Sequence, residues 1–131
     1  MLRIIALSLI ALLSAEAFAE VLTIEKRSHT IDGVTNHYLL EVDVEYIKMS
    51  PKLDPAIDEL PMSVSKAINL AISKYKESYK SEPWGIGSVS LNHFPSRDYK
   101  DRWYFKVVIM GKPHVGVVVL FNEKVVLPNK Q

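Results

Sequence analysis

One stretch of the sequence has a sustained helical period, and it limits the possible folds more than any other feature. Within residues 62–80, apolar side chains recur at spacings typical of one side of a helix. The stripe consists of Val64, Ala67, Ile68, Ala71, Ile72, Tyr75 and Tyr79. Such a stripe must be buried against another layer, and the strand-like segments around it offer a sheet face. The sequence therefore predicts a helix packed on a sheet.

The predicted helix has recognisable ends. Ser63 is expected to cap the N-terminus, near which Asp58 and Glu59 suit the positive end of the helix dipole. Pro83 follows the last apolar position and cannot continue a helix. Residues 48–61, which contain three prolines, form an ordered connection that leads into the helix.

Two strand patterns precede this connection, at residues 21–31 and 34–47. They flank Asp32-Gly33, a dipeptide typical of hairpin turns. In the second segment apolar and acidic residues alternate, as expected for a strand with one buried face. The apolar set is Tyr38, Leu40, Val42, Val44 and Tyr46, and the acidic set is Glu41, Asp43 and Glu45.

The hairpin register can be predicted in two ways. A two-residue turn at Asp32-Gly33 places Glu25 opposite Leu40, which puts a charge beside the apolar face. A three-residue loop ending at Gly33 places Ile24 opposite Leu40 and keeps apolar residues together. Because the buried face normally fixes the register of a strand pair, we prefer the three-residue loop.

Three strands are predicted after the helix, at residues 86–94, 102–110 and 115–121, with a short fourth at 124–127. The second is apolar on parts of both faces, so we expect it to be central in the sheet. The predicted fold class is α+β. A hairpin at residues 20–47 is followed by one long helix, and an antiparallel meander of three to four strands spans residues 86–127.

The distribution of charge fits one domain better than a nucleic-acid-binding protein. Residues 20–62 carry nine acids and four bases, whereas residues 63–131 carry five acids and eleven bases. A nucleic-acid-binding domain normally concentrates basic residues on one surface. Here the two halves are expected to attract each other within a single domain, residues 20–131, whose length suits one core.

The start of the chain predicts export. Residues 1–19 combine Arg3, an apolar core at residues 4–13, and an A-x-A cleavage site that ends at Ala19, which leaves Glu20 as the new N-terminus. The apolar core is too short to span a membrane. The chain has no cysteine, so it has neither a lipoprotein anchor nor disulfides. We expect a periplasmic or secreted protein with no membrane span after cleavage.

The sequence contains no complete motif for a metal site or for a catalytic nucleophile. The four histidines, His29, His37, His93 and His114, are not at metal-ligand spacing. Gly85 and Ser88 lack the second glycine and the following helix of a hydrolase elbow. The acidic row of Glu41, Asp43 and Glu45 is interpreted as the solvated face of a strand, because its carboxylates do not converge. No cofactor or metal is therefore predicted.

The candidate binding residues lie around the connection between the first two meander strands. Arg97, Tyr99, Lys100 and Arg102 mix guanidinium, ammonium and aromatic groups, a composition favoured at protein interfaces. Trp84, just before the first of these strands, is the fifth candidate. In the alternative interpretation, the loop is an ordinary charged hairpin tip and Trp103 belongs to the core.

The C-terminal half resembles small exported domains of the cystatin and PepSY type. The resemblance covers residues 63–127 and rests on the helix with small apolar residues and on the strand patterns at 102–109 and 117–126. It implies a cystatin-like fold and, for the PepSY type, an accessory or inhibitory binding role outside the cytoplasm. The chain lacks the Q-x-V-x-G hairpin of cystatins. Its Pro83-Trp84 precedes the first meander strand, whereas the Pro-Trp loop of cystatins lies in a late hairpin. The resemblance therefore does not imply protease inhibition.

Two classes of function remain open at this stage. The first is an exported, non-catalytic binding module whose partner is another exported or envelope protein. The second is a small cofactor-free hydrolase or isomerase with a cavity between helix and sheet. An enzyme needs a titratable group directed into that cavity, and the predicted inward faces offer only tyrosine hydroxyls. The binding module is therefore the preferred reading. The sequence does not indicate an oligomeric state.

The export hypothesis predicts the mass of the mature protein. Because cleavage is expected after Ala19, intact-mass spectrometry of the secreted protein should give a chain that begins at Glu20. A membrane-embedded product that retains Met1 would contradict this prediction.

Overall fold

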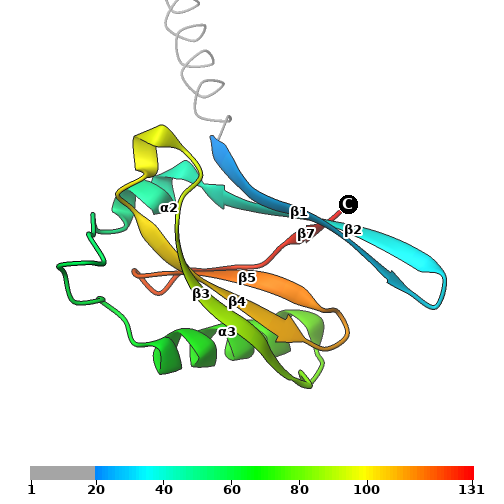
Figure 1. The fold of residues 1–131 in the computed structure, drawn as a ribbon. Helices are drawn as coiled ribbons and strands as arrows, with labels where there is room; N and C mark the ends of the chain where they lie inside the picture. The colour runs from blue at the N-terminus through cyan, green and yellow to red at the C-terminus, as the bar shows by residue number, and fades with distance from the viewer. Residues whose placement is uncertain (1–19) are drawn as a thin grey trace, which may run out of the picture.

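The chain forms two antiparallel sheets and two α-helices in a computed structural model that describes residues 20–131 (Figure 1). The predicted signal peptide, including Ala19, lies outside the described residues. The elements are β1 (Val21–Ile31), β2 (Val34–Asp43), α2 (Val44–Met49), α3 (Val64–Tyr79), β3 (Gly85–His93), the 3-10 helix η1 (Arg97–Tyr99), β4 (Trp103–Met110), β5 (Val115–Leu120), β6 (Val125–Val126) and β7 (Asn129–Lys130). The predicted α+β class is confirmed.

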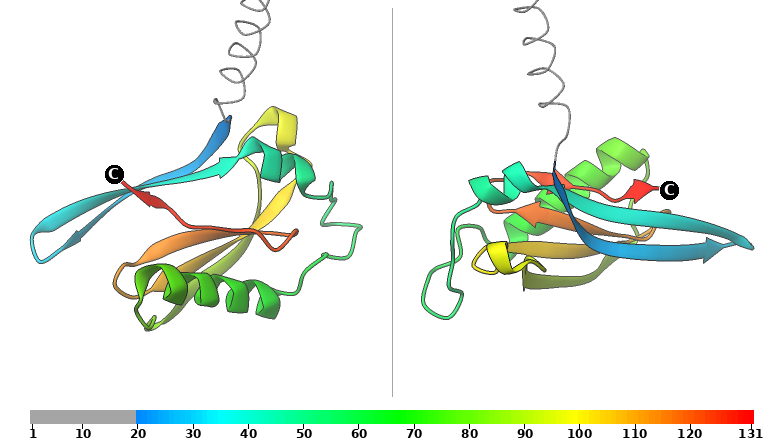
Figure 2. Two further views of the ribbon diagram at one scale, coloured as in Figure 1. Left: turned by 180° about the vertical axis from the view of Figure 1, so that it is seen from behind. Right: turned by 90° about the horizontal axis from the view of Figure 1, so that it is seen from above.

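The four-stranded sheet, ordered β3-β4-β5-β6, is the middle layer of the fold. Helix α3 covers one of its faces, and the β1–β2 hairpin with α2 lies on the other (Figures 1 and 2). In β4, Phe105 and Val107 face α3, whereas Tyr104 packs with Leu40 and Phe94 on the hairpin side. The predicted antiparallel meander and the central position of its second strand are confirmed.

Helix α3 contacts the sheet along the line of Ala67, Ala71 and Tyr75, all fully buried. The predicted stripe was therefore too broad on one side. Ile68 and Ile72 are only half-buried, and Val64 is 46% exposed. The two small alanines centre the helix on the sheet, so the positions that follow them fall at the margin of the interface. Leu70, outside the predicted stripe, packs against the core.

The ends of α3 are close to the predicted ones. Ser63 is the N-cap, and its hydroxyl oxygen accepts a hydrogen bond from the Lys66 N–H at 3.1 Å, as expected. Lys80 adopts a left-handed conformation at the C-cap. The Tyr75 hydroxyl donates to the Pro113 carbonyl at 2.7 Å and so ties the helix to the β4–β5 turn. A Cβ on Gly111 would lie 2.5 Å from that hydroxyl oxygen, which explains the glycine there.

The preferred three-residue hairpin loop is wrong. Asp32 and Gly33 form a two-residue turn with positive φ at both positions, and Ile31 pairs with Val34. Glu25 therefore lies opposite Leu40. This register places a charge beside an apolar residue, but the Glu25 carboxylate has a partner in Lys106 of β4.

A β-bulge resolves the conflict between turn geometry and the buried face. The register shifts by one residue between Thr23 and Glu25, so that Leu22 lies opposite Val42. Turn chemistry thus fixes the outer half of the hairpin, and burial fixes the inner half. The bulge contains the one residue by which the two registers differ.

The second strand is also shorter than predicted. β2 ends at Asp43, and residues 44–49 form α2, in which Val44 and Ile47 share the buried side of one turn. Alternation at residues 44–47 suits a strand, but burial over the end of the sheet selects a helix. β7, which was not predicted as a strand, pairs with β2 through Tyr38 and Leu39.

The revised helix face gives a test of the fold. Ala71→Asp would place an unpaired carboxylate in the fully buried line between α3 and the sheet. We expect a loss on the order of several kcal/mol, comparable with the whole stability of a small domain. Ser73→Asp, an exposed position on the same helix, is the matched control. Similar melting temperatures for the two variants, measured by circular dichroism, would contradict this packing.

Candidate functional site

Four of the five predicted binding residues lie in the loop between β3 and β4. Arg97 and Lys100 are exposed, whereas Tyr99 is half-buried and packs against the core on the hairpin side of the sheet. Ser96 caps η1, and the Arg102 N–H donates to the Tyr99 carbonyl at 3.0 Å. The loop is therefore a folded turn that presents two basic side chains to solvent.

Arg102, the fourth predicted residue, forms hydrogen bonds within the domain. Its Nη1 donates to the carbonyl of Lys48 at 3.0 Å and also to the carbonyl of Ser50. These carbonyls lie at the C-terminal end of α2, where a positive charge is favourable. The guanidinium therefore holds α2 against the loop.

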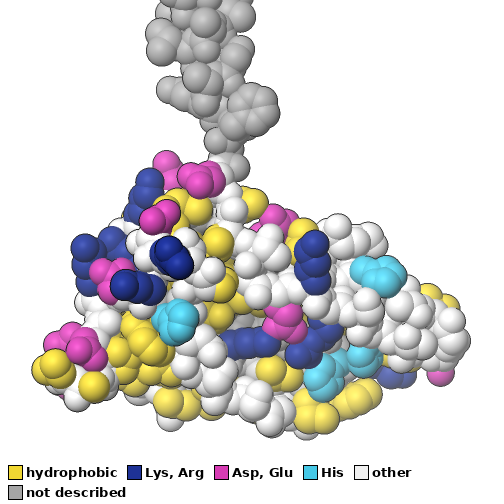
Figure 3. Space-filling model, turned by 45° about the horizontal axis from the view of Figure 1, so that its top comes forward, with side chains coloured by type: hydrophobic (Ala, Val, Ile, Leu, Met, Phe, Trp, Pro, Cys, Tyr) yellow, Lys and Arg dark blue, Asp and Glu magenta, His cyan; other side chains and the backbone are white. Residues whose placement is uncertain are grey.

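This contact creates a surface that the sequence did not predict, because α2 itself was not predicted. We call residues 45–52 and 97–102 the α2–η1 surface. It contains five bases and three acids, and Met49 on it is 69% exposed. Lys52 pairs in β-bridge geometry with Arg102, and its Nζ lies 3.7 Å from the Asp101 carboxylate. Lys and Arg side chains gather over α2 and η1 in Figure 3.

Trp84, the fifth predicted residue, lies at the other end of β3. It is 69% exposed, and its N–H donates to the Met110 carbonyl at 2.7 Å. The nine residues of β3 separate it from the η1 loop by about 30 Å at the usual strand rise. A single copy of the chain does not bring Trp84 and the loop together.

The predicted acidic row does not exist as a row. Glu41 and Asp43 lie on β2 and are half-buried, whereas Glu45 is exposed on α2. The prediction is wrong because α2 turns the chain after Asp43. The residues opposite Glu41 and Asp43 on β1 are Thr23 and Val21.

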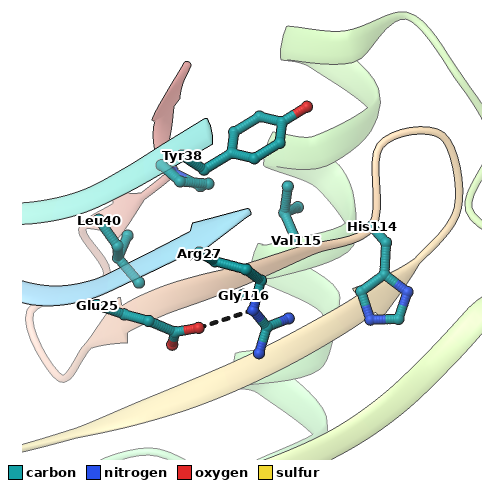
Figure 4. A pocket seen from close by; sticks show the side chains of 8 residues that line it. Glu25, Arg27, Tyr38, Leu40, His114, Val115 and Gly116 are labelled. Atoms are coloured by element: carbon teal, nitrogen blue, oxygen red, sulfur yellow. Dashed lines mark ion pairs between the residues drawn. The ribbon is translucent and has the colours of Figure 1, made fainter. Parts of the chain in front are cut away.

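A second group of polar side chains lies between the hairpin and the sheet (Figure 4). We call Glu25, Arg27, His29, Lys106 and His114 the arm cluster. Glu25 forms an ion pair with Lys106 of β4, each side chain being 22% exposed, and a second with Arg27 at 2.8 Å. The rings of His29 and His114 stack with their centroids 5.7 Å apart. These contacts join β1 to β4 and to the turn before β5.

The electrostatics of the arm cluster favour the charged form of Glu25 and the neutral form of His114. Burial by itself would raise the pKa of the Glu25 carboxyl, but the hydrogen bond and charge of Lys106, together with Arg27, outweigh burial and lower that pKa. Burial lowers the pKa of His114, and the positive charges of Arg27 and His29 lower it further. The adjoining cavity is about 10 Å³, the size needed for about one water.

The sequence held two signals for this cluster. Lys106 is the one charged residue in the apolar strand β4, and Gly116 interrupts an otherwise apolar β5. A Cβ on Gly116 would lie 2.9 Å from Cε of Lys106, so the glycine makes room for the lysine side chain. An isolated lysine in a buried strand predicts a carboxylate partner, although not which one.

A wider groove runs below the hairpin on the side of β7. Its volume is about 440 Å³, and Tyr38, Tyr79, Lys112 and Lys130 are among the residues that line it. Burial, together with Tyr38 and Tyr75, raises the pKa of Tyr79 to about 12, so its hydroxyl remains protonated. No carboxylate lines this groove.

Comparisons of the chain with known protein families, curated proteins and solved structures found no match. Within residues 20–131, no helix is long and apolar enough to cross a membrane, and no group of three or more His, Cys, Asp or Glu side chains is placed to hold a metal ion.

The Glu25 ion pairs predict an acid-dependent loss of stability. Because the folded-state pKa of Glu25 lies below 4.5, its contribution is complete above pH 4.5 and is lost as the pH falls through the folded-state value. The melting temperature of the protein should therefore fall as the pH is lowered below 4.5, and it should fall less in Glu25→Gln. An identical pH dependence in the two proteins would contradict this role.

Proposed function

We propose that this protein is an exported, non-catalytic module that binds another exported or envelope protein through the α2–η1 surface. The observation that supports this proposal is the combination, on one folded surface, of exposed Arg97 and Lys100 with exposed Lys48, Lys52 and Met49. Loops held by a rigid sheet are common binding elements.

The surface suggests the chemistry of its partner. The five bases and three acids leave two more positive than negative charges, and Met49 adds an apolar contact that can adapt its shape. Charge complementarity favours a partner that offers carboxylates around an apolar side chain. Arg102 supports this surface from behind, because its guanidinium is occupied by the carbonyls of Lys48 and Ser50.

The enzyme alternative has less support in the geometry. It requires a cavity between helix and sheet, but Ala67, Ala71 and Tyr75 pack there against the apolar face of the sheet. The Tyr75 hydroxyl, a polar group in that layer, is already bonded to the Pro113 carbonyl. We therefore do not propose a reaction.

Capture by the immobilised protein from a periplasmic or culture-medium extract tests the proposal. Arg97→Ala combined with Lys100→Ala should weaken capture of the partner at least about tenfold, or about 1.4 kcal/mol, and leave the melting temperature nearly unchanged. Tyr99 is kept, because it packs against the core and its removal would confuse binding with stability.

Lys26→Ala combined with Lys112→Ala is the matched control, since it removes the same charge from exposed positions outside the α2–η1 surface. Equal capture by both double variants, or loss of capture in the control alone, would contradict the assignment.

A further inference from the structure

The two sheets have four edge strands, and these edges differ in how they are protected. β6 and β7 are only two residues long. β1 carries Glu25, Lys26 and Arg27, and charged side chains discourage pairing with another chain. β3 is nine residues long and contains no Lys, Arg, Asp, Glu or Pro. Its protection is limited to one bulge between Ile86 and Ser88.

The outer edge of β3 offers backbone groups for pairing. The Phe94 N–H donates to the Arg102 carbonyl, so Asn92, Ser90 and Ser88, at steps of two along the strand, are the positions that bond toward β4. Because hydrogen-bonding direction alternates along an antiparallel strand, the N–H and C=O groups of Val89 and Leu91 point away from β4. No described element lies beyond this edge, as the view from above in Figure 2 shows.

We propose that β3 pairs antiparallel with β3 of a second copy of this chain, so that two four-stranded sheets join into one. The pattern around Ser90 is self-complementary. A two-fold axis at Ser90 places Ser88 opposite Asn92 and Val89 opposite Leu91, so polar residues meet polar ones and apolar residues meet apolar ones.

This pairing would also explain two exposed residues. Trp84 and Met110, 69% and 40% exposed, lie together at one end of β3, and the η1 loop lies at the other. An antiparallel partner reverses the ends, so the end of β3 that carries Trp84 in one copy lies near the η1 loop, which carries Arg97, of the other. An indole beside a guanidinium is a favourable pair. The dimer thus brings together binding residues that one copy keeps apart.

Sedimentation of the secreted protein over a dilution series tests the pairing. We expect a species of twice the chain mass. Ser90→Lys places like charges opposite each other at the axis and should raise the dimer dissociation constant at least about tenfold. Because Ser90 also lies opposite Lys106 of β4, we expect this variant to melt at a lower temperature, and the uncharged variant Ser90→Cys separates loss of the dimer from loss of stability. Thr23→Lys, an exposed position on the edge strand β1, is the matched control and should remain dimeric.

A second measurement uses the absence of cysteine from the chain. Facing residues at the axis have Cα atoms about 4.5 Å apart, within disulfide reach, so Ser90→Cys should form a covalent dimer on oxidation and Thr23→Cys should not. A wild-type protein of single-chain mass at every concentration would overturn the proposal, as would a Ser90→Lys protein that dimerises like the wild type. If the wild type is monomeric and Ser90→Lys no longer captures the partner, the edge of β3 binds a different protein, and the proposal is overturned.

Discussion

The burial of both faces of the β3–β6 sheet is the constraint on which the rest of the structure depends. β5 is buried along its whole length, and β4 alternates between two core clusters. A sheet that is apolar on both sides needs two covering layers. Helix α3 provides one layer through Ala67, Ala71 and Tyr75, and the β1–β2 hairpin with α2 provides the other.

Apolar contacts are not the only interactions that hold the second covering layer. A two-stranded hairpin is at best marginally stable alone, and here it is held by an ion pair between Glu25 and Lys106 and by the short strand β7. The charge at position 25 also explains the bulge, because Glu25 must point toward Lys106 while Leu22 still meets Val42. The two-residue turn and the Glu25–Lys106 pair thus favour one register in the outer half of the hairpin, and burial favours another in the inner half.

The same architecture leaves two exposed regions beside the covered sheet, the α2–η1 surface and the edge of β3. Arg102 fixes α2 to the β3–β4 loop, and this gives exposed basic residues a rigid support. β3 remains at the edge, uncharged and without a covering element among the described residues. The stable centre and the accessible edge are consequences of one arrangement, since a sheet covered on both faces can still be open along its side.

Local patterns in the sequence determined the elements, and the tertiary structure determined how they meet. The period of residues 62–80, the cap at Ser63 and the alternation in the meander identified α3 and three strands, because these signals arise between residues close in the chain. The start of α2, the bulge and the Glu25–Lys106 pair were missed, since each depends on contacts with segments far away in sequence. Lys106 indicated a partner, but only the crossing of the hairpin over β4 shows that the partner is Glu25. The proposed binding surface follows the same rule, because its loop could be found from composition, whereas α2 depends on how the layers assemble.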